Sequence, residues 1–197
     1  MKNLSKLMVL ATAAAFLLAG CAKKPTQEVN TAETAIKGAV EDGAAIYAEE
    51  ELKKLQDDFA AAEVEVTTQS KKFFKKYGKA KETLAKITTD AAALRTTVAA
   101  RKEEAKNNAL SAQDEAKMAL EEAKALLENA PRGKGTQADI EAFSADLKAL
   151  EDSLAEVQQA LDSEDYLGAV DKATIIKEKA SGISIQIQQA IEKVKKK

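Results

Sequence analysis

The sequence predicts an all-α protein in which two antiparallel helical hairpins form an elongated, coiled-coil-like bundle. Charged residues make up 31% of the 197 residues and aromatic residues 4%, a composition typical of long helices and coiled coils. Apolar residues recur at alternating steps of three and four positions, which is the spacing of one helix face, and no series of strands is indicated. The two prolines, Pro25 and Pro131, lie outside the periodic segments.

Residues 1–20 have the order of a secretory signal peptide. Two lysines precede an apolar run from Leu7 to Leu18, and the small residues Ala19 and Gly20 follow. The run is about 12 residues long, whereas a bilayer-spanning helix needs roughly 20. We therefore predict a cleaved signal and not a transmembrane anchor.

The only cysteine, Cys21, directly follows this signal. Residues 18–21, Leu-Ala-Gly-Cys, resemble the lipobox of bacterial lipoproteins at every position. The resemblance implies cleavage before Cys21, lipidation of its sulfur by fatty chains such as palmitate, and anchoring in a membrane. Because Ala22 and not aspartate follows, similarity to enterobacterial sorting favours the outer membrane, with the chain facing the periplasm or exposed at the cell surface. The alternative is an ordinary signal with an incidental cysteine.

A polar, lipidated tether is predicted at residues 21–28, followed by a first long helical hairpin at residues 29–130. The apolar spacing of the first helix is regular from Val29 to Val66 except for a phase break near residues 47–51. The hairpin alone would bury little apolar surface, so stacking on the second hairpin or on a partner is expected to complete its core.

A second helix is predicted from about Phe74 to Asn129. Its apolar seam shifts by four residues near Arg101, a stutter that locally unwinds a left-handed supercoil. Arg101 and Asn108 lie at or beside the seam there, and they mark either a partner-facing patch or a loosening of the bundle. Beyond the shift, the predicted seam consists of Ala112, Ala116, Ala119, Ala123, Leu126 and Ala130.

The second half of the chain begins with a linker at residues 131–135, which contains a proline and two glycines. Residues 136–197 are predicted to form a second helical hairpin, with Thr136 as the N-cap and a polar turn at residues 162–165. Its seam positions are Ile140, Phe143, Leu147, Leu150, Leu154, Val157 and Leu161, then Tyr166, Ala169, Ala173, Ile176, Ala180, Ile183, Ile187, Ala190 and Val194.

The two halves of the chain echo each other. Residues 51–59 align with residues 146–154, and each copy is followed by a Tyr-x-x-Ala motif, which begins at Tyr77 in the first copy and at Tyr166 in the second. The first copy has six more residues before its tyrosine. The pattern indicates two related helical hairpins.

The motif Tyr47-Ala48-x-x-Glu51-Leu52, followed by Tyr77-x-x-Ala80, resembles a family of small bacterial envelope lipoproteins that share a helical domain of unknown function. The resemblance covers about residues 32–95 and implies no activity. Many members have a proline after the Tyr-Ala pair, where this chain has Glu49. This difference predicts that the first helix is continuous.

The sequence contains few of the residues and motifs that are typical of catalytic sites. The chain contains no histidine, its one cysteine is assigned to lipid, and no glycine-rich phosphate loop or calcium loop is present. Without residues 1–20 the chain keeps 28 basic and 32 acidic residues, so neither sign dominates. Together with export, this argues against a nucleic-acid partner. We predict a protein that is not an enzyme and has no catalytic residues, no metal and no cofactor.

One basic and aromatic patch is a candidate interaction site. It consists of Lys71, Lys72, Phe73, Phe74, Lys75, Lys76 and Tyr77. Its lysines and rings are suited to anionic lipid headgroups or to an acidic partner. The alternative, which we favour from the sequence, is a turn whose aromatic residues cap the end of the first hairpin while its lysines face water.

The C-terminus gives a further candidate. The lipidated N-terminus, the alanine-rich heptads and the terminal Lys197 resemble the major outer-membrane lipoprotein of enteric bacteria, which implies attachment of Lys197 to peptidoglycan. The alternative is that the last lysines complement the dipole of the final helix.

The expected function is that of a structural or scaffolding element that contacts protein or peptidoglycan in the envelope. An accessory subunit of an envelope complex is the alternative, and the oligomeric state is not predicted.

Overall fold

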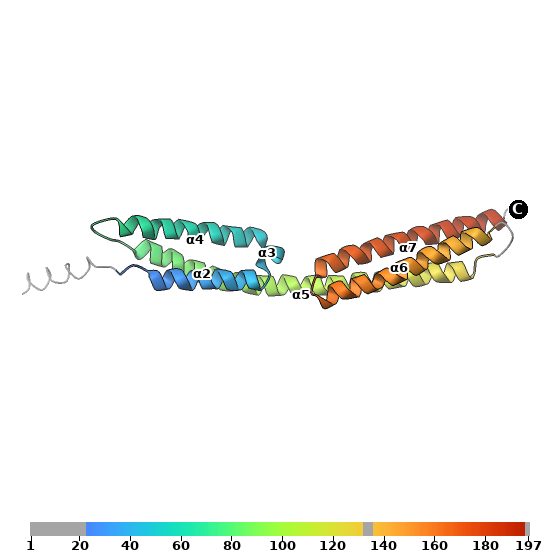
Figure 1. Cartoon of the computed structure of the whole chain (residues 1–197), viewed down its shortest axis with the longest axis horizontal. Coiled ribbons are helices and arrows are strands. Elements are labelled where there is room, and N and C mark those ends of the chain that lie inside the picture. The colour runs from blue at the N-terminus through green and yellow to red at the C-terminus, as the bar shows by residue number, and fades with distance from the viewer. Residues whose placement is uncertain (1–22, 132–135, 196–197) are drawn as a thin grey trace, which may run out of the picture. The chain divides into compact units, whose positions relative to one another are not determined.

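The computed structural model describes residues 23–131 and 136–195, and this part of the chain is helical, with no strand (Figure 1). The all-α prediction is confirmed. The predicted signal peptide, Cys21, Lys197 and most of the predicted linker lie outside the described residues. The helices are α2 (Thr26–Glu41), α3 (Ala44–Tyr47), α4 (Glu49–Ser70), α5 (Gly78–Glu128), α6 (Gln137–Asp162) and α7 (Tyr166–Lys195).

The chain divides into two compact units, residues 1–101 and residues 102–197, and α5 contributes a part to each. The sequence placed the border at residues 131–135 instead. Proline and glycine are absent from residues 79–128, so nothing in the sequence interrupts α5 where one unit ends. The border between the units therefore lies inside a helix and has no breaker to mark it.

The prediction of a continuous first helix is wrong, because the chain turns twice between Val29 and Val66. Gly43 follows α2 with a φ of 103°, a left-handed conformation that glycine adopts without steric cost. Ala48 then separates α3 from α4 with a φ of −156° and a ψ of 48°. As a result α2 and α4 pack against each other, and the phase break near residues 47–51 marks this turn.

The core of unit 1 is a thin seam that combines α2, α4 and the first part of α5. Alanines alternate in it with larger aliphatic residues, and Tyr77 closes it at one end. Its buried residues are Ala32, Ile36, Ala39, Ala44, Ala48, Leu52, Leu55, Ala62, Val66, Tyr77, Ala80, Leu84, Ile87, Ala91, Leu94 and Val98.

In unit 2, α6 and α7 pack along each other and are joined by residues 163–165. Glu164 has a φ of 61°, and Asp165 Oδ1 accepts a hydrogen bond of 3.1 Å from the backbone N–H of Gly168 in the first turn of α7. Most predicted seam positions of these two helices are buried, although Ile140, Phe143, Leu154 and Ala190 are half-buried and Val194 is exposed.

The second part of α5 corrects three positions of the predicted seam. Gln113, Leu120 and Leu127 are buried, whereas the predicted Ala112, Ala119 and Leu126 are half-buried. The predicted Ala116 and Ala123 are fully buried, and the seam runs one residue later only at the three positions that alternate with them. At Leu120 the larger side chain takes the inward position beside Ala119, because it buries more apolar surface. Gln113 Nε2 donates a hydrogen bond of 3.1 Å to Gln158 Oε1 on α6.

The start of α6 differs from the predicted cap in one respect. Thr136 does occupy the N-cap position, but its side chain makes no capping hydrogen bond to the helix. Its hydroxyl instead donates a hydrogen bond of 3.0 Å to the backbone oxygen of Pro131.

Among the described helices, none is long and apolar enough to cross a membrane.

Candidate functional site

The loop between α4 and α5 holds the predicted interaction patch. We call residues 71–76 the basic-aromatic loop. Helix α4 ends at Ser70, and Lys71 and Lys72 continue it with backbone hydrogen bonds to Thr68 (3.3 Å) and Gln69 (3.1 Å). The loop then leaves the helix and reaches Tyr77, directly before α5.

Gln69 holds the loop in place, and the sequence analysis did not identify it. Its side chain is buried, its Oε1 accepts a hydrogen bond of 3.2 Å from the backbone N–H of Lys76, and its Nε2 donates one of 2.8 Å to Glu65 Oε1. The amide thus connects the last turn of α4 to the far end of the loop. Gln69 lies three residues after Val66 and so continues the apolar spacing of Ala62 and Val66. This spacing indicates, from the sequence alone, that the polar side chain of Gln69 faces inward.

The three aromatic residues of the patch have different environments. Tyr77 is only 2% exposed and belongs to the core of unit 1. Phe73 and Phe74 are 90% and 71% exposed. The two phenyl rings contact each other edge to face, with centroids 5.0 Å apart. Of the aromatic residues that the favoured prediction placed in a packed turn, Tyr77 is therefore buried, whereas the two phenylalanines are exposed.

The four lysines of the basic-aromatic loop face solvent, as predicted. Within residues 23–131 and 136–195, none of them forms an ion pair. No acidic residue occurs between Glu65 and Glu82 in the sequence. The loop is accordingly a concentration of positive charge around two exposed phenyl rings.

The basic-aromatic loop lies at the end of unit 1 where α2 begins (Figure 1). Lys81, in the first turn of α5, forms an ion pair of 2.7 Å with Glu28 in the first turn of α2. Pro25, directly before α2, is almost completely buried. Since α2 begins at Thr26, the predicted tether at residues 21–28 is too long, and only the residues before Pro25 precede the packed chain.

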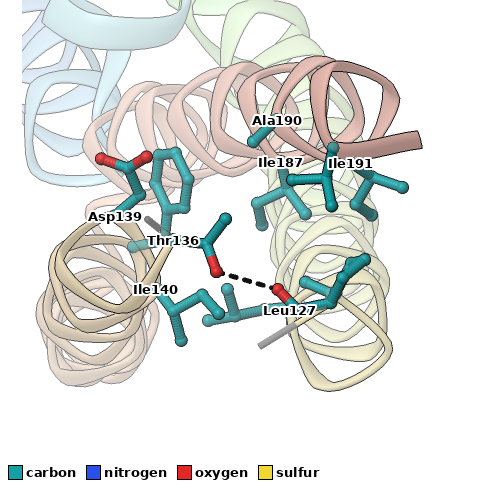
Figure 2. A pocket seen from close by; sticks show the side chains of 11 residues that line it. Leu127, Thr136, Asp139, Ile140, Ile187, Ala190 and Ile191 are labelled. Carbon is teal, nitrogen blue, oxygen red and sulfur yellow. Dashed lines mark hydrogen bonds between the residues drawn. The ribbon is translucent and has the colours of Figure 1, made fainter. Parts of the chain in front are cut away.

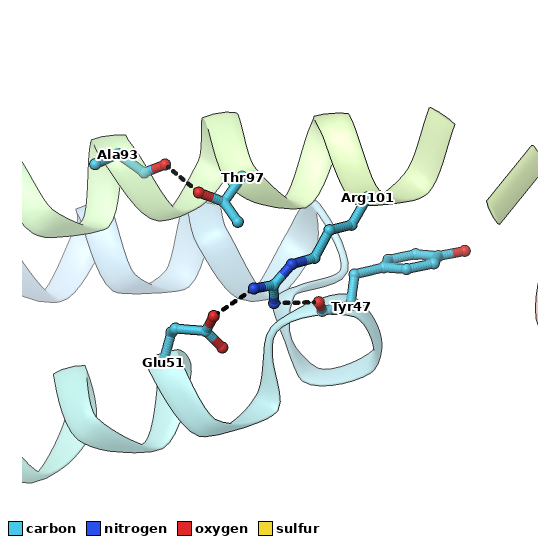
Figure 3. Close-up of polar contacts among 5 residues, drawn as sticks. All are labelled: Tyr47, Glu51, Ala93, Thr97 and Arg101. Atoms are coloured by element: carbon cyan, nitrogen blue, oxygen red, sulfur yellow. Dashed lines mark hydrogen bonds and ion pairs between the residues drawn. The ribbon is translucent and has the colours of Figure 1, made fainter. Parts of the chain in front are cut away.

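The family-like motif at Tyr47 and Glu51 is held by Arg101 (Figure 3). Arg101 Nη1 donates a hydrogen bond of 2.8 Å to the backbone oxygen of Tyr47, and Nη2 pairs with Glu51 Oε1 at 2.6 Å. The guanidinium thus ties α5 to the break between α3 and α4. Of the two residues singled out at the stutter, Arg101 has this role within unit 1, and Asn108 is exposed on α5.

The bond from Arg101 lowers the pKa of Glu51 below its ordinary value of 4.5, with a smaller contribution from a backbone hydrogen bond. A lowered pKa means that the ion pair stabilises the fold above pH 4.5, and this contribution is lost as the pH falls through the lowered pKa. We expect Arg101→Gln to raise the pKa of Glu51 toward 4.5, as measured by NMR titration of its carboxyl carbon. Arg95→Gln, which removes a partner of Asp42, is the control and should leave the pKa of Glu51 unchanged. An unchanged pKa in Arg101→Gln would contradict the assignment.

A small cavity in unit 2 lies between the ends of α5 and α7 and the start of α6 (Figure 2). Its volume is about 20 Å³, and its lining includes Leu127, Ile140, Phe143 and Ile187. Small-molecule sites are usually about 300–1,000 Å³, so this cavity is a packing gap with room for about one water. No cluster of three or more potential metal ligands occurs in the described residues.

The fold and site define an all-helical protein of two compact units, with an exposed basic-aromatic loop at the end of unit 1 where α2 begins. Comparison of the chain with protein-family models, curated proteins and solved structures gives no match. The resemblance to envelope lipoproteins stays a prediction from the sequence.

Proposed function

We propose that the protein is a lipid-anchored, non-enzymatic lipoprotein of the bacterial cell envelope that acts as a structural or scaffolding element in the periplasm. The observation that carries the proposal is the sequence Leu18-Ala19-Gly20-Cys21 at the end of a short apolar run. Several fatty chains at one residue hold a protein firmly, because each buried CH₂ contributes about 0.8 kcal/mol.

The helical units suit a function based on contact. A coiled-coil-like association of long helices, as the sequence predicts, is part of this proposal. The absence of histidine from the sequence removes the most common general acid and base, and the single cysteine is assigned to lipid. Linkage of Lys197 to peptidoglycan and service as an accessory subunit stay secondary proposals.

Metabolic labelling with palmitate tests the anchor. We expect label in the wild-type chain and none in Cys21→Ser, because serine lacks the sulfur that accepts the lipid. Ala22→Ser changes the neighbouring residue and keeps the cysteine, so this control should be labelled like the wild type. An unlabelled wild-type chain in a bacterial host that labels its own lipoproteins would refute the proposal.

A further inference from the structure

We propose that the basic-aromatic loop docks onto the anionic lipid surface in which Cys21 is anchored. Phe73 and Phe74 enter the headgroup region, and the neighbouring lysines contact headgroup phosphates. This inference rests on the proposed function, since it takes the lipid at Cys21 as the anchor. It adds a second membrane contact that orients unit 1.

The phenylalanine pair is the first argument. Large apolar side chains grouped at a surface mark interaction sites more often than single exposed residues do. Phe73 and Phe74 are 90% and 71% exposed and already packed against each other. Aromatic and aliphatic side chains next to lysines are typical of segments that lie at the boundary between headgroups and acyl chains.

Charge is the second argument, and it selects a lipid surface. Lys71, Lys72, Lys75 and Lys76 flank the two rings, and Lys23 and Lys24 are exposed in the chain that leads from Cys21 to Pro25. Anionic lipids attract basic residues that lie within a Debye length of the membrane surface. The charge of the loop is thus complementary to such a surface.

The position of the loop is the third argument. A chain of n residues spans at most about 3.5 Å × n, so Pro25 lies within about 14 Å of Cys21. Pro25 is packed, and the ion pair between Glu28 and Lys81 fixes the start of α2 beside the start of α5. An anchor at Cys21 therefore brings the basic-aromatic loop, just before α5, to the membrane surface.

The second half of the chain supplies a fourth argument. There, Tyr166 is buried like Tyr77, but residues 163–165 alone connect α6 to α7. In the first half, residues 71–76 lie between the end of α4 and Tyr77, so this connection is longer than residues 163–165. Closing such a connection over a buried tyrosine does not require the additional length, so the loop presents a surface beyond what folding needs.

Tryptophan fluorescence tests the docking, since the sequence contains no tryptophan. Phe74→Trp places a tryptophan in the loop, which we call the loop probe. Ile46→Trp places one in α3, beyond the opposite end of α4, which we call the α3 probe. The two positions have similar exposed fractions, 71% and 65%. Helix α4 has 22 residues, and at 1.5 Å per residue it separates the two probes by roughly 30 Å.

The full-length protein is reconstituted through its own anchor into vesicles of phosphatidylethanolamine and phosphatidylglycerol. We expect a blue-shifted emission from the loop probe that brominated lipid quenches, and an unshifted emission from the α3 probe that acrylamide quenches. In vesicles of phosphatidylcholine alone, the shift of the loop probe should be lost. A loop probe that stays as accessible to acrylamide as the α3 probe in the anionic vesicles overturns the proposal and leaves the loop to a protein partner.

A charge variant tests the role of the lysines in the same Phe74→Trp background. Replacing all four lysines of the loop by glutamine should weaken docking about fivefold per lysine. High salt should weaken the docking of the unchanged loop in the same direction, but by less. An undiminished shift of the loop probe in this variant would refute the electrostatic part of the proposal. Mass analysis of the Cys21 peptide from the same samples separates the proposed lipid anchor from the proposed docking. Missing acyl chains on Cys21 refute the anchor. An exposed loop probe on an acylated chain refutes only the docking.

Discussion

Tyr77→Ala is expected to destabilise unit 1 by about 3–5 kcal/mol, the range measured when large buried aromatic side chains are removed. Tyr77 is 2% exposed and packs in the core of unit 1 directly after the basic-aromatic loop. Its removal leaves a cavity where α4, the loop and α5 meet. Urea denaturation followed by circular dichroism measures the loss.

Phe73→Ala is the matched control for Tyr77→Ala, because it truncates an aromatic residue of the same segment. Phe73 is almost fully exposed, so its replacement should change the free energy of unfolding by less than about 0.5 kcal/mol. Comparison of the two variants distinguishes Tyr77, which supports the fold, from Phe73 and Phe74, which are available for binding. Equal losses in the two variants would show that Phe73 supports the fold, and the docking proposal would lose its main argument.

Leu84→Ala has the second large expected effect, a loss of about 3 kcal/mol in the free energy of unfolding. Leu84 is completely buried on α5, in the core of unit 1 between Ala80 and Ile87. Its truncation removes buried apolar surface and leaves a cavity that the packed seam fills only in part. The midpoint of urea denaturation should therefore fall markedly.

Val64→Ala is the control for this second variant. Val64 is 66% exposed on α4 in the same unit, and its truncation should stay within about 0.5 kcal/mol of the wild type. If Leu84→Ala were no more harmful than Val64→Ala, the assignment of the α5 seam in unit 1 would have to be revised.

The sequence predicted the helical class and most of the buried positions, because period and composition act locally. In α6 and α7 the apolar steps run without interruption, and the buried positions match them closely from Leu147 to Ile187. Where a larger residue lies beside an alanine, as Leu120 does beside Ala119, burial of the larger side chain decides the inward face. The prediction from spacing did not consider side-chain size, so it chose Ala119 in place of Leu120, although it placed Ala116 and Ala123 correctly.

The break in the first helix and the exposure of the loop phenylalanines depend on tertiary packing. Gly43 is compatible with a helix at a modest cost, and only its left-handed φ in the folded chain shows that the chain turns there. Likewise, apolar composition alone does not distinguish Phe73 from Tyr77. Phe73 and Tyr77 both continue the spacing of Ala80 and Leu84, and they differ because α5 begins only at Gly78. Tyr77 directly precedes the helix and packs in the core, whereas Phe73 lies in the loop and is exposed.

The alanine seam has a consequence for how this chain can change over time. Exposed alanines such as Ala92, Ala93, Ala99 and Ala100 face water and are free to drift to larger or polar residues. Ala91, completely buried among them, has no such freedom, because added methylenes in a packed interior cost about 1–3 kcal/mol. Neighbouring copies of the same small residue are thus under opposite selective constraints, and tolerance to substitution should follow a helical period.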